Sequence, residues 1–178
     1  IDLAGQGGLV WLKSRSGSLP HTLYDTERGN QSALFTSLTN SAVNGNASYE
    51  TTFNSDGFAT NTSGGNINVS GTAQVAWTFR EAPGFFDVVT YTGTGSAQDI
   101  AHNLGVEPGM VIVKQTDSTT NWFVHHRGDF DTVGILNDTG GFFTRDATNF
   151  PTNPTSSNFS IGTSSSVNLS GGTYVAYV

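Results

Sequence analysis

The sequence contains the same series of short motifs twice, about 100 residues apart. The matching pairs are residues 8–13 (GLVWLK) with 109–114 (GMVIVK), Arg28 with Arg127, Phe58 with Phe159, 68–71 (NVSG) with 168–171 (NLSG), and 73–77 (AQVAW) with 173–177 (TYVAY). Their order is the same in both halves. Collinear matches at a nearly constant offset predict a duplicated structural unit.

The repeat predicts a division of the chain into residues 1–80 and residues 81–178. The joining segment contains a strand-like run at residues 85–91 (FFDVVTY), so the full repeat begins near Phe85 and the first copy lacks its opening strands. We therefore expect the chain to be a segment of a longer, repetitive polypeptide. The missing strands would then come from flanking sequence or from a neighbouring subunit.

Strand signals dominate the sequence, and helix signals are weak. Residues 9–12 and 110–113 are continuous apolar runs, while Ala73, Val75, Trp77 and Phe79 alternate with other residues along a seven-residue stretch. Turn-forming residues separate these runs, as at residues 63–65 (SGG). This pattern predicts an all-β fold with little or no helix, built as two tandem jelly-roll-like β-sandwich repeats or as one merged sandwich.

Composition excludes several classes of protein. The 12 Phe, 5 Tyr and 3 Trp argue against a disordered linker. A net charge of −7, with 7 Lys plus Arg spread singly, lacks the cationic surface that nucleic-acid binding requires. The chain has no cysteine, which excludes disulfides and thiolate metal sites. No run of 18 apolar residues occurs, so we expect no insertion into a membrane.

These motifs resemble a repeat domain of marine bacteriophage tail-fibre and virion appendage proteins. The segments that carry the resemblance are residues 8–15, 23–29, 53–58 and 75–77, then 100–105 with Pro108, 111–114 and 121–122. The resemblance implies a location on the virion surface, a homotrimer, contacts with other virion proteins and attachment to a host cell-surface glycan or outer-membrane protein. The alternatives are a structural virion protein without a ligand, as in a capsid decoration or fibre shaft, and a glycan-degrading depolymerase.

Two clusters offer the aromatic and polar side chains that carbohydrate recognition uses. They are Tyr24 with Asp25 and Arg28, and Asn121 with Trp122, His125 and Arg127. The competing interpretation is core packing, because residues 23–24 and 122–123 occupy equivalent places in the repeat. The segments 32–50 and 130–149 differ between the copies, so we expect them to form exposed loops that could carry recognition.

Catalytic signals are weak, and we predict no enzyme, cofactor or metal site. The carboxylates closest in sequence are Asp25 with Glu27 and Asp129 with Asp131, a spacing that a glycosidase could use but that solvated loops also show. No Gly-x-Ser-x-Gly motif is present. His125 and His126 would point to opposite faces of an extended strand, so they cannot jointly bind one metal ion.

Overall fold

A computed structural model describes residues 1–60 and 67–178, and the turn expected at residues 63–65 lies outside them. Strands make up 40% of the described residues and helices 6%. The predicted all-β class is therefore confirmed. Each of the two described α-helices, α1 (Leu3–Gln6) and α2 (Ser165–Asn168), is four residues long. No helix among the described residues could span a lipid bilayer.

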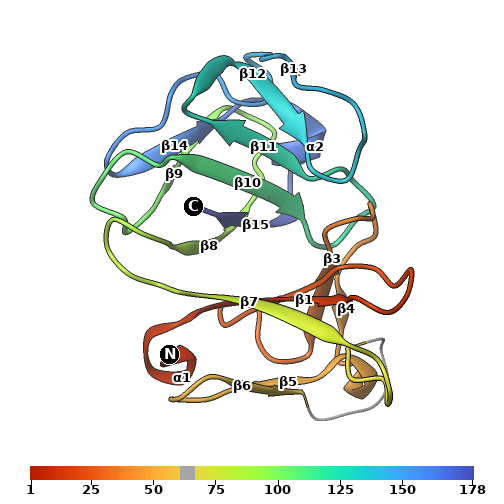
Figure 1. The fold of residues 1–178 in the computed structure, drawn as a ribbon. Coiled ribbons are helices and arrows are strands. Elements are labelled where there is room, and N and C mark those ends of the chain that lie inside the picture. Colours follow the sequence, from red (N-terminus) through yellow and green to blue (C-terminus); the bar gives the residue numbers. More distant parts are fainter. Residues whose placement is uncertain (61–66) are drawn as a thin grey trace.

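The first half of the chain forms one five-stranded antiparallel sheet and one hairpin (Figure 1). The sheet has the order β4-β3-β2-β1-β7, with β1 (Gly8–Ser14), β2 (Thr22–Asp25), β3 (Ser32–Phe35), β4 (Val43–Asn44) and β7 (Gln74–Arg80). A 3-10 helix, η1 (Ala47–Tyr49), precedes the hairpin of β5 (Thr51–Phe53) and β6 (Phe58–Thr60).

The second half forms a six-stranded sheet of order β13-β12-β11-β10-β15-β8. Its strands are β8 (Val88–Thr92), β10 (Met110–Gln115), β11 (Phe123–His126), β12 (Asp129–Ile135), β13 (Phe143–Thr144) and β15 (Thr173–Tyr177). A separate pair, β9 (Gln98–Ala101) with β14 (Asn158–Ile161), lies beside this sheet.

The two main sheets share one hydrophobic core and each has a further core on its other side. Leu9, Leu23 and Leu34 of the first sheet pack with Trp122 and Tyr177 of the second half in the shared core. The outer core of the first half contains its hairpin and α1, and that of the second half contains β9 and β14. The chain is thus a stack of layers with the main sheets in the middle (Figure 1).

The repeated motifs occupy corresponding strands. The order β3-β2-β1-β7 in the first sheet matches β12-β11-β10-β15 in the second. The lysine that ends each apolar run makes corresponding contacts as well. Lys13 Nζ donates to the carbonyls of Gly17 and Leu19, and Lys114 Nζ donates to those of Ser118 and Thr120. In each half, the lysine holds the loop that follows its own strand.

The glycine that begins the first repeat is required by close packing. Gly8 has a φ of +146°, and a Cβ atom there would lie 2.1 Å from the carbonyl oxygen of Phe79. Any side chain would therefore push β1 and β7 apart at the end of the sheet that adjoins the joining segment.

Candidate functional site

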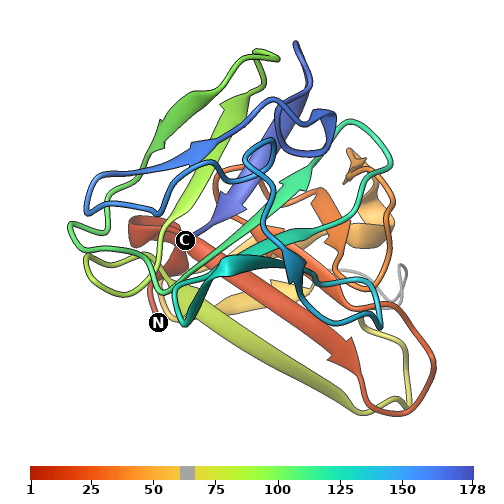
Figure 2. The ribbon, with the colours of Figure 1, turned by 90° about the horizontal axis from the view of Figure 1, so that it is seen from above.

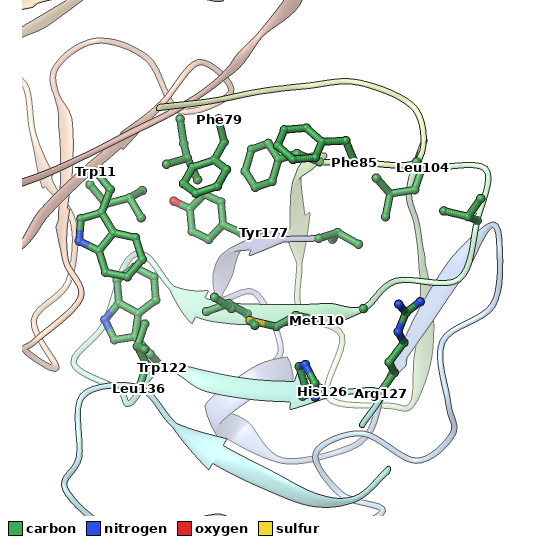
Figure 3. A pocket seen from close by; sticks show the side chains of 18 of the residues that line it. Trp11, Phe79, Phe85, Leu104, Met110, Trp122, His126, Arg127, Leu136 and Tyr177 are labelled. Atoms are coloured by element: carbon green, nitrogen blue, oxygen red, sulfur yellow. The ribbon is translucent and has the colours of Figure 1, made fainter. Parts of the chain in front are cut away.

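A groove of about 600 Å³ lies between the two main sheets, on the side where the segment joining β7 to β8 passes. In Figure 3, Phe79 and Phe85 lie on one side of the groove, Met110, His126 and Arg127 lie on the other, and Trp11 and Trp122 lie at one end. The remaining lining residues are Leu9, Leu23, Thr36, Gly84, Phe86, Leu104, Val106, Glu107, Gly109, Ile112, Leu136, Tyr177 and Val178.

The rim of the groove exposes large apolar side chains. The exposed fractions are 62% for Phe85, 48% for Val106 and 43% for Met110. Trp122 and Tyr177 contribute buried rings to the same lining. Large apolar side chains gathered around a concave surface are typical of binding sites, because a partner that covers them removes apolar surface from water.

A tight turn presents the most exposed of these rings. The Ala82 N–H donates to the Phe86 carbonyl at 3.0 Å, and Gly84 between them has a φ of +72°. Phe79 lies against both Phe85 and Phe86, with ring centroids 6.3 and 5.6 Å away. The turn therefore holds three phenylalanine rings together along one side of the groove.

Few charged groups line the groove. Arg127 and His126 are exposed at the end of β11, and Glu107 is exposed in the loop before β10. The backbone N–H of Arg127 donates to the Gly109 carbonyl at 3.0 Å, and His126 Nδ1 accepts from the backbone N–H of Gly128 at 3.0 Å. The hydrogen bonds fix the backbone here, and the guanidinium is a polar group on a mainly apolar surface.

The first predicted cluster lies inside the protein. Tyr24 is fully buried in the outer core of the first half, where burial raises the pKa of its hydroxyl. Asp25 is also fully buried and forms an ion pair with Arg28, at 2.6 Å between Oδ2 and a terminal guanidinium nitrogen. The Tyr177 hydroxyl donates to the same Asp25 oxygen at 2.6 Å. The ring of Tyr24 and the carboxylate of Asp25 are therefore enclosed by protein in this structure.

The second predicted cluster divides between core and surface. Trp122 is fully buried at one end of the groove, and its indole N–H is shared by the carbonyls of Phe35 and Leu38, each at 3.1 Å. His125 is buried between Phe130 and Phe150, where burial lowers its pKa. Asn121 accepts a hydrogen bond from Asn137.

Arg127 is the one exposed member of the seven predicted residues. It shares the groove lining with Trp122.

The sequence analysis missed Phe85, Val106 and Met110 as site residues. The available signal was the Pro83-Gly84 turn directly before two phenylalanines, which indicates aromatic rings next to a chain reversal. Among residues 1–60 and 67–178, no group of three or more His, Asp or Glu side chains could hold a metal ion. The proposed acidic pairs are not equivalent, since Asp25 is buried in its ion pair while Asp129 and Asp131 are exposed.

An acidic cluster lies where the chain leaves β7. Burial, together with the nearby carboxylates of Glu27, Asp87 and Asp25, raises the pKa of Glu81 to about 7. One carboxyl oxygen of Glu81 is buried without a hydrogen-bond partner among the described residues. The folded state therefore holds the proton of Glu81 more tightly than the unfolded state does.

We expect the free energy of unfolding to fall as the pH rises from about 4.5 to about 7, because the folded protein binds more protons than the unfolded chain in that interval. Glu81→Gln should remove this pH-dependent change in the free energy of unfolding, which we expect to be about 1 kcal/mol. The change is smaller than the pKa shift alone implies, because water partly screens the carboxyl group. Urea unfolding of both proteins at several pH values measures the difference. Parallel stability curves for the variant and the wild type would contradict the assignment.

Comparison with known proteins places this architecture in one family. No curated protein and no solved structure matches the chain. A family model described as a domain of unknown function, DUF7483, matches residues 2–178. Both main sheets and the groove between them lie inside this match. The chain therefore belongs to the DUF7483 family.

Proposed function

We propose that this chain is a non-enzymatic attachment module on the surface of a virion appendage such as a tail fibre, and that it binds a host cell-surface component in the groove. The observation that carries the proposal is the set of exposed apolar side chains around that groove, above all Phe85 at 62% exposure. Keeping such a ring in water is unfavourable, and a partner that covers it gains that free energy on binding.

The lining favours a particular kind of receptor. Apolar side chains outnumber the charged residues Arg127 and Glu107 and the imidazole of His126. An apolar segment of an outer-membrane component fits this surface better than a polar glycan, which needs several hydrogen-bonding groups around an aromatic face. Arg127 would then contact a polar or anionic group beside the apolar segment.

The proposal includes a tandem arrangement of two sandwich repeats, residues 1–80 and 81–178. The matching strand order and the corresponding roles of Lys13 and Lys114 support it. Assembly as a trimer would present three grooves together, so that weak individual contacts add through avidity.

The second candidate function is a purely structural part of the virion. It is favoured by the outer edge of β7, which pairs with no strand among the described residues and could join neighbouring units. A depolymerase is the third candidate, and it has less support because Asp25, one of its four proposed carboxylates, is buried in an ion pair.

Cell binding tests the attachment proposal. We expect the labelled protein to bind some members of a panel of marine bacteria, and to bind outer-membrane vesicles prepared from the same strains. The double variant Phe85→Ser and Met110→Ser should bind about tenfold more weakly or worse, because it removes two exposed apolar contacts. Flow cytometry and vesicle sedimentation measure the change, and a glycan array checks for sugar ligands.

Phe142→Ser is the matched control, because Phe142 is 56% exposed but lies outside the groove. It should bind as the wild type does. Equal binding by the groove variant and the wild type would exclude the groove as the attachment site. Release of reducing sugars from host polysaccharide would favour the depolymerase.

A further inference from the structure

The outer edge of β7 presents backbone groups that pair with no strand in residues 1–60 and 67–178. At the two ends of the β1–β7 pair, the backbone N–H of Glu81 donates to the Gly7 carbonyl at 3.1 Å and the backbone N–H of Arg15 donates to the Ala73 carbonyl at 2.8 Å. The register between these ends is continuous, so the odd-numbered residues of β7 form the hydrogen bonds with β1. Hydrogen-bonding groups alternate along an antiparallel strand. The groups of the even-numbered residues therefore point away from β1, and these residues are Gln74, Ala76, Thr78 and Arg80. Figure 2 shows β7 along the outer margin of the molecule.

The corresponding edge in the second half is covered by a strand. There β8 pairs with β15 along five residues, from Thr173 opposite Thr92 to Tyr177 opposite Val88. This partner strand lies in the segment that joins the two halves, and no strand of the described residues takes the corresponding place beside β7.

Burial differs between equivalent positions in the way that a missing strand predicts. Ala176 is fully buried in the outer core of the second half, against which Val89 and Tyr91 of β8 pack, whereas Ala76 is exposed. Tyr177 is 4% exposed in the shared core, which includes Val88 of β8, and its counterpart Trp77 is 45% exposed. The residues at these positions are alike, and β8 is one contributor to the burial that β7 lacks.

The edge of β7 lacks the features that usually prevent strand addition. Its seven residues pair with β1 in continuous register, without a bulge, and they include no proline. The one charged residue is Arg80 at its end. Natural edge strands are generally short, bulged, charged or covered, so a long, regular and mainly uncharged edge indicates a surface that receives a partner.

The inward side chain of a β8-type strand would meet different residues in the two halves. In the second half, Tyr91 of β8 stacks on Tyr174 at 4.9 Å between ring centroids and donates to the Val167 carbonyl at 2.7 Å. The equivalents of these partners in the first half are Gln74, which is half-buried at the open edge, and Ile67, which is in the outer core.

We propose that β7 accepts, by strand addition, the β8-type strand of another copy of this repeat. The accepted strand is uncharged, rich in β-branched residues and antiparallel to β7. It pairs with β7 as β8 pairs with β15, with backbone hydrogen bonds giving affinity and the inward tyrosine giving register. The acceptor is the backbone edge of β7, whereas the groove is lined by side chains, among them that of Phe79 in the same strand. The proposal goes beyond receptor attachment, and its test measures strand addition alone, so it does not depend on whether the groove binds a host component.

The test uses the whole chain and a capped synthetic peptide of residues 86–94. Hydrogen–deuterium exchange with mass spectrometry should show slower exchange of residues 74–80, by about tenfold at a peptide concentration ten times the dissociation constant. Residues 173–177 should not change, because β8 already covers them.

Two methylated peptides are the matched controls. Asp87 and Val178 exchange both of their backbone hydrogen bonds, so Val89 and Tyr91 also face β15 while Thr90 faces away. N-methylation of Val89 should therefore abolish protection of β7, and N-methylation of Thr90 should preserve it. In the protein, Ala76→Pro removes an outward N–H and should abolish peptide binding without disturbing the β1 ladder.

Three results would overturn the proposal. One is the absence of protection at residues 74–80. Another is equal protection by both methylated peptides, which would indicate binding that is not strand addition. The third is protection of β7 that appears with protein concentration in the absence of peptide while exchange of β8 stays unchanged, which would indicate pairing of two β7 edges.

Discussion

Replacing Trp122 with alanine should lower the free energy of unfolding by about 3–5 kcal/mol. The side chain is fully buried and stacks on Tyr177 at 6.3 Å between ring centroids. Its indole N–H also donates to the carbonyls of Phe35 and Leu38, which belong to the other half of the chain. Alanine would leave a cavity in the shared core and would leave both carbonyls without this donor. Urea unfolding followed by circular dichroism measures the loss.

Trp77→Ala is the matched control, since Trp77 is 45% exposed at the open edge of the first sheet. Its cost should be about 1 kcal/mol or less. Trp122→Phe should fall between the two, because it retains most of the packing and loses the hydrogen bonds. Similar losses for the Trp122→Ala and Trp77→Ala variants would show that the core between the sheets contributes little to stability.

The position of Trp122 also predicts how the chain unfolds. Its ring lies in the core that both main sheets share, so neither sheet can lose its order without exposing that core. We therefore interpret the two halves as one cooperative unit, although the sequence repeat divides them.

The sequence predicted the strands better than their arrangement. The apolar runs at residues 9–12 and 110–113 lie within β1 and β10, and the alternating stretch from Ala73 to Phe79 lies almost entirely within β7. These patterns are local consequences of side-chain direction along a strand. The expectation that His125 and His126 point to opposite faces is also confirmed, since His125 is buried and His126 is exposed.

The groove could not be predicted because it depends on how distant strands pack. Met110 and Val111 are adjacent apolar residues of one strand, yet Met110 is 43% exposed and Val111 is fully buried. Their exposed fractions differ because Met110 lies at the groove between the two main sheets. Those sheets bring together segments that are far apart in the sequence. Alternation identifies residues that share a face, but it does not show which face remains open to solvent.

The packing of distant strands also explains why predicted site residues are buried. Tyr24 and Asp25 follow each other in β2, which is buried on both faces because the shared core lies on one side and an outer core on the other. A strand in a two-layer sandwich would have kept one face in water. The core-packing interpretation that accompanied the carbohydrate hypothesis fits the burial of Tyr24 and Trp122.

Loss of the buried ion pair between Asp25 and Arg28 should destabilise the protein about as much as loss of the Trp122 side chain. Asp25→Ala should lower the free energy of unfolding by about 3–5 kcal/mol, because it leaves the Arg28 guanidinium buried without its counter-charge. Asp25 accepts the Arg28 backbone N–H at 2.8 Å and Nε at 2.7 Å, in addition to the Tyr177 hydroxyl. The Tyr177 hydroxyl thus joins the ion pair of the first half to the last strand of the second. Urea unfolding measures the loss.

Glu27→Ala is the control for this variant, since Glu27 is an exposed carboxylate two residues away. Its effect should stay within about 0.5 kcal/mol. The triple variant Asp25→Leu, Arg28→Met and Tyr177→Phe removes both charges and the Tyr177 hydroxyl at once, and it should be more stable than Asp25→Ala alone because no buried charge is left unpaired. If the triple variant were no more stable than Asp25→Ala, the loss would come from altered packing, and the unpaired guanidinium would not be its cause.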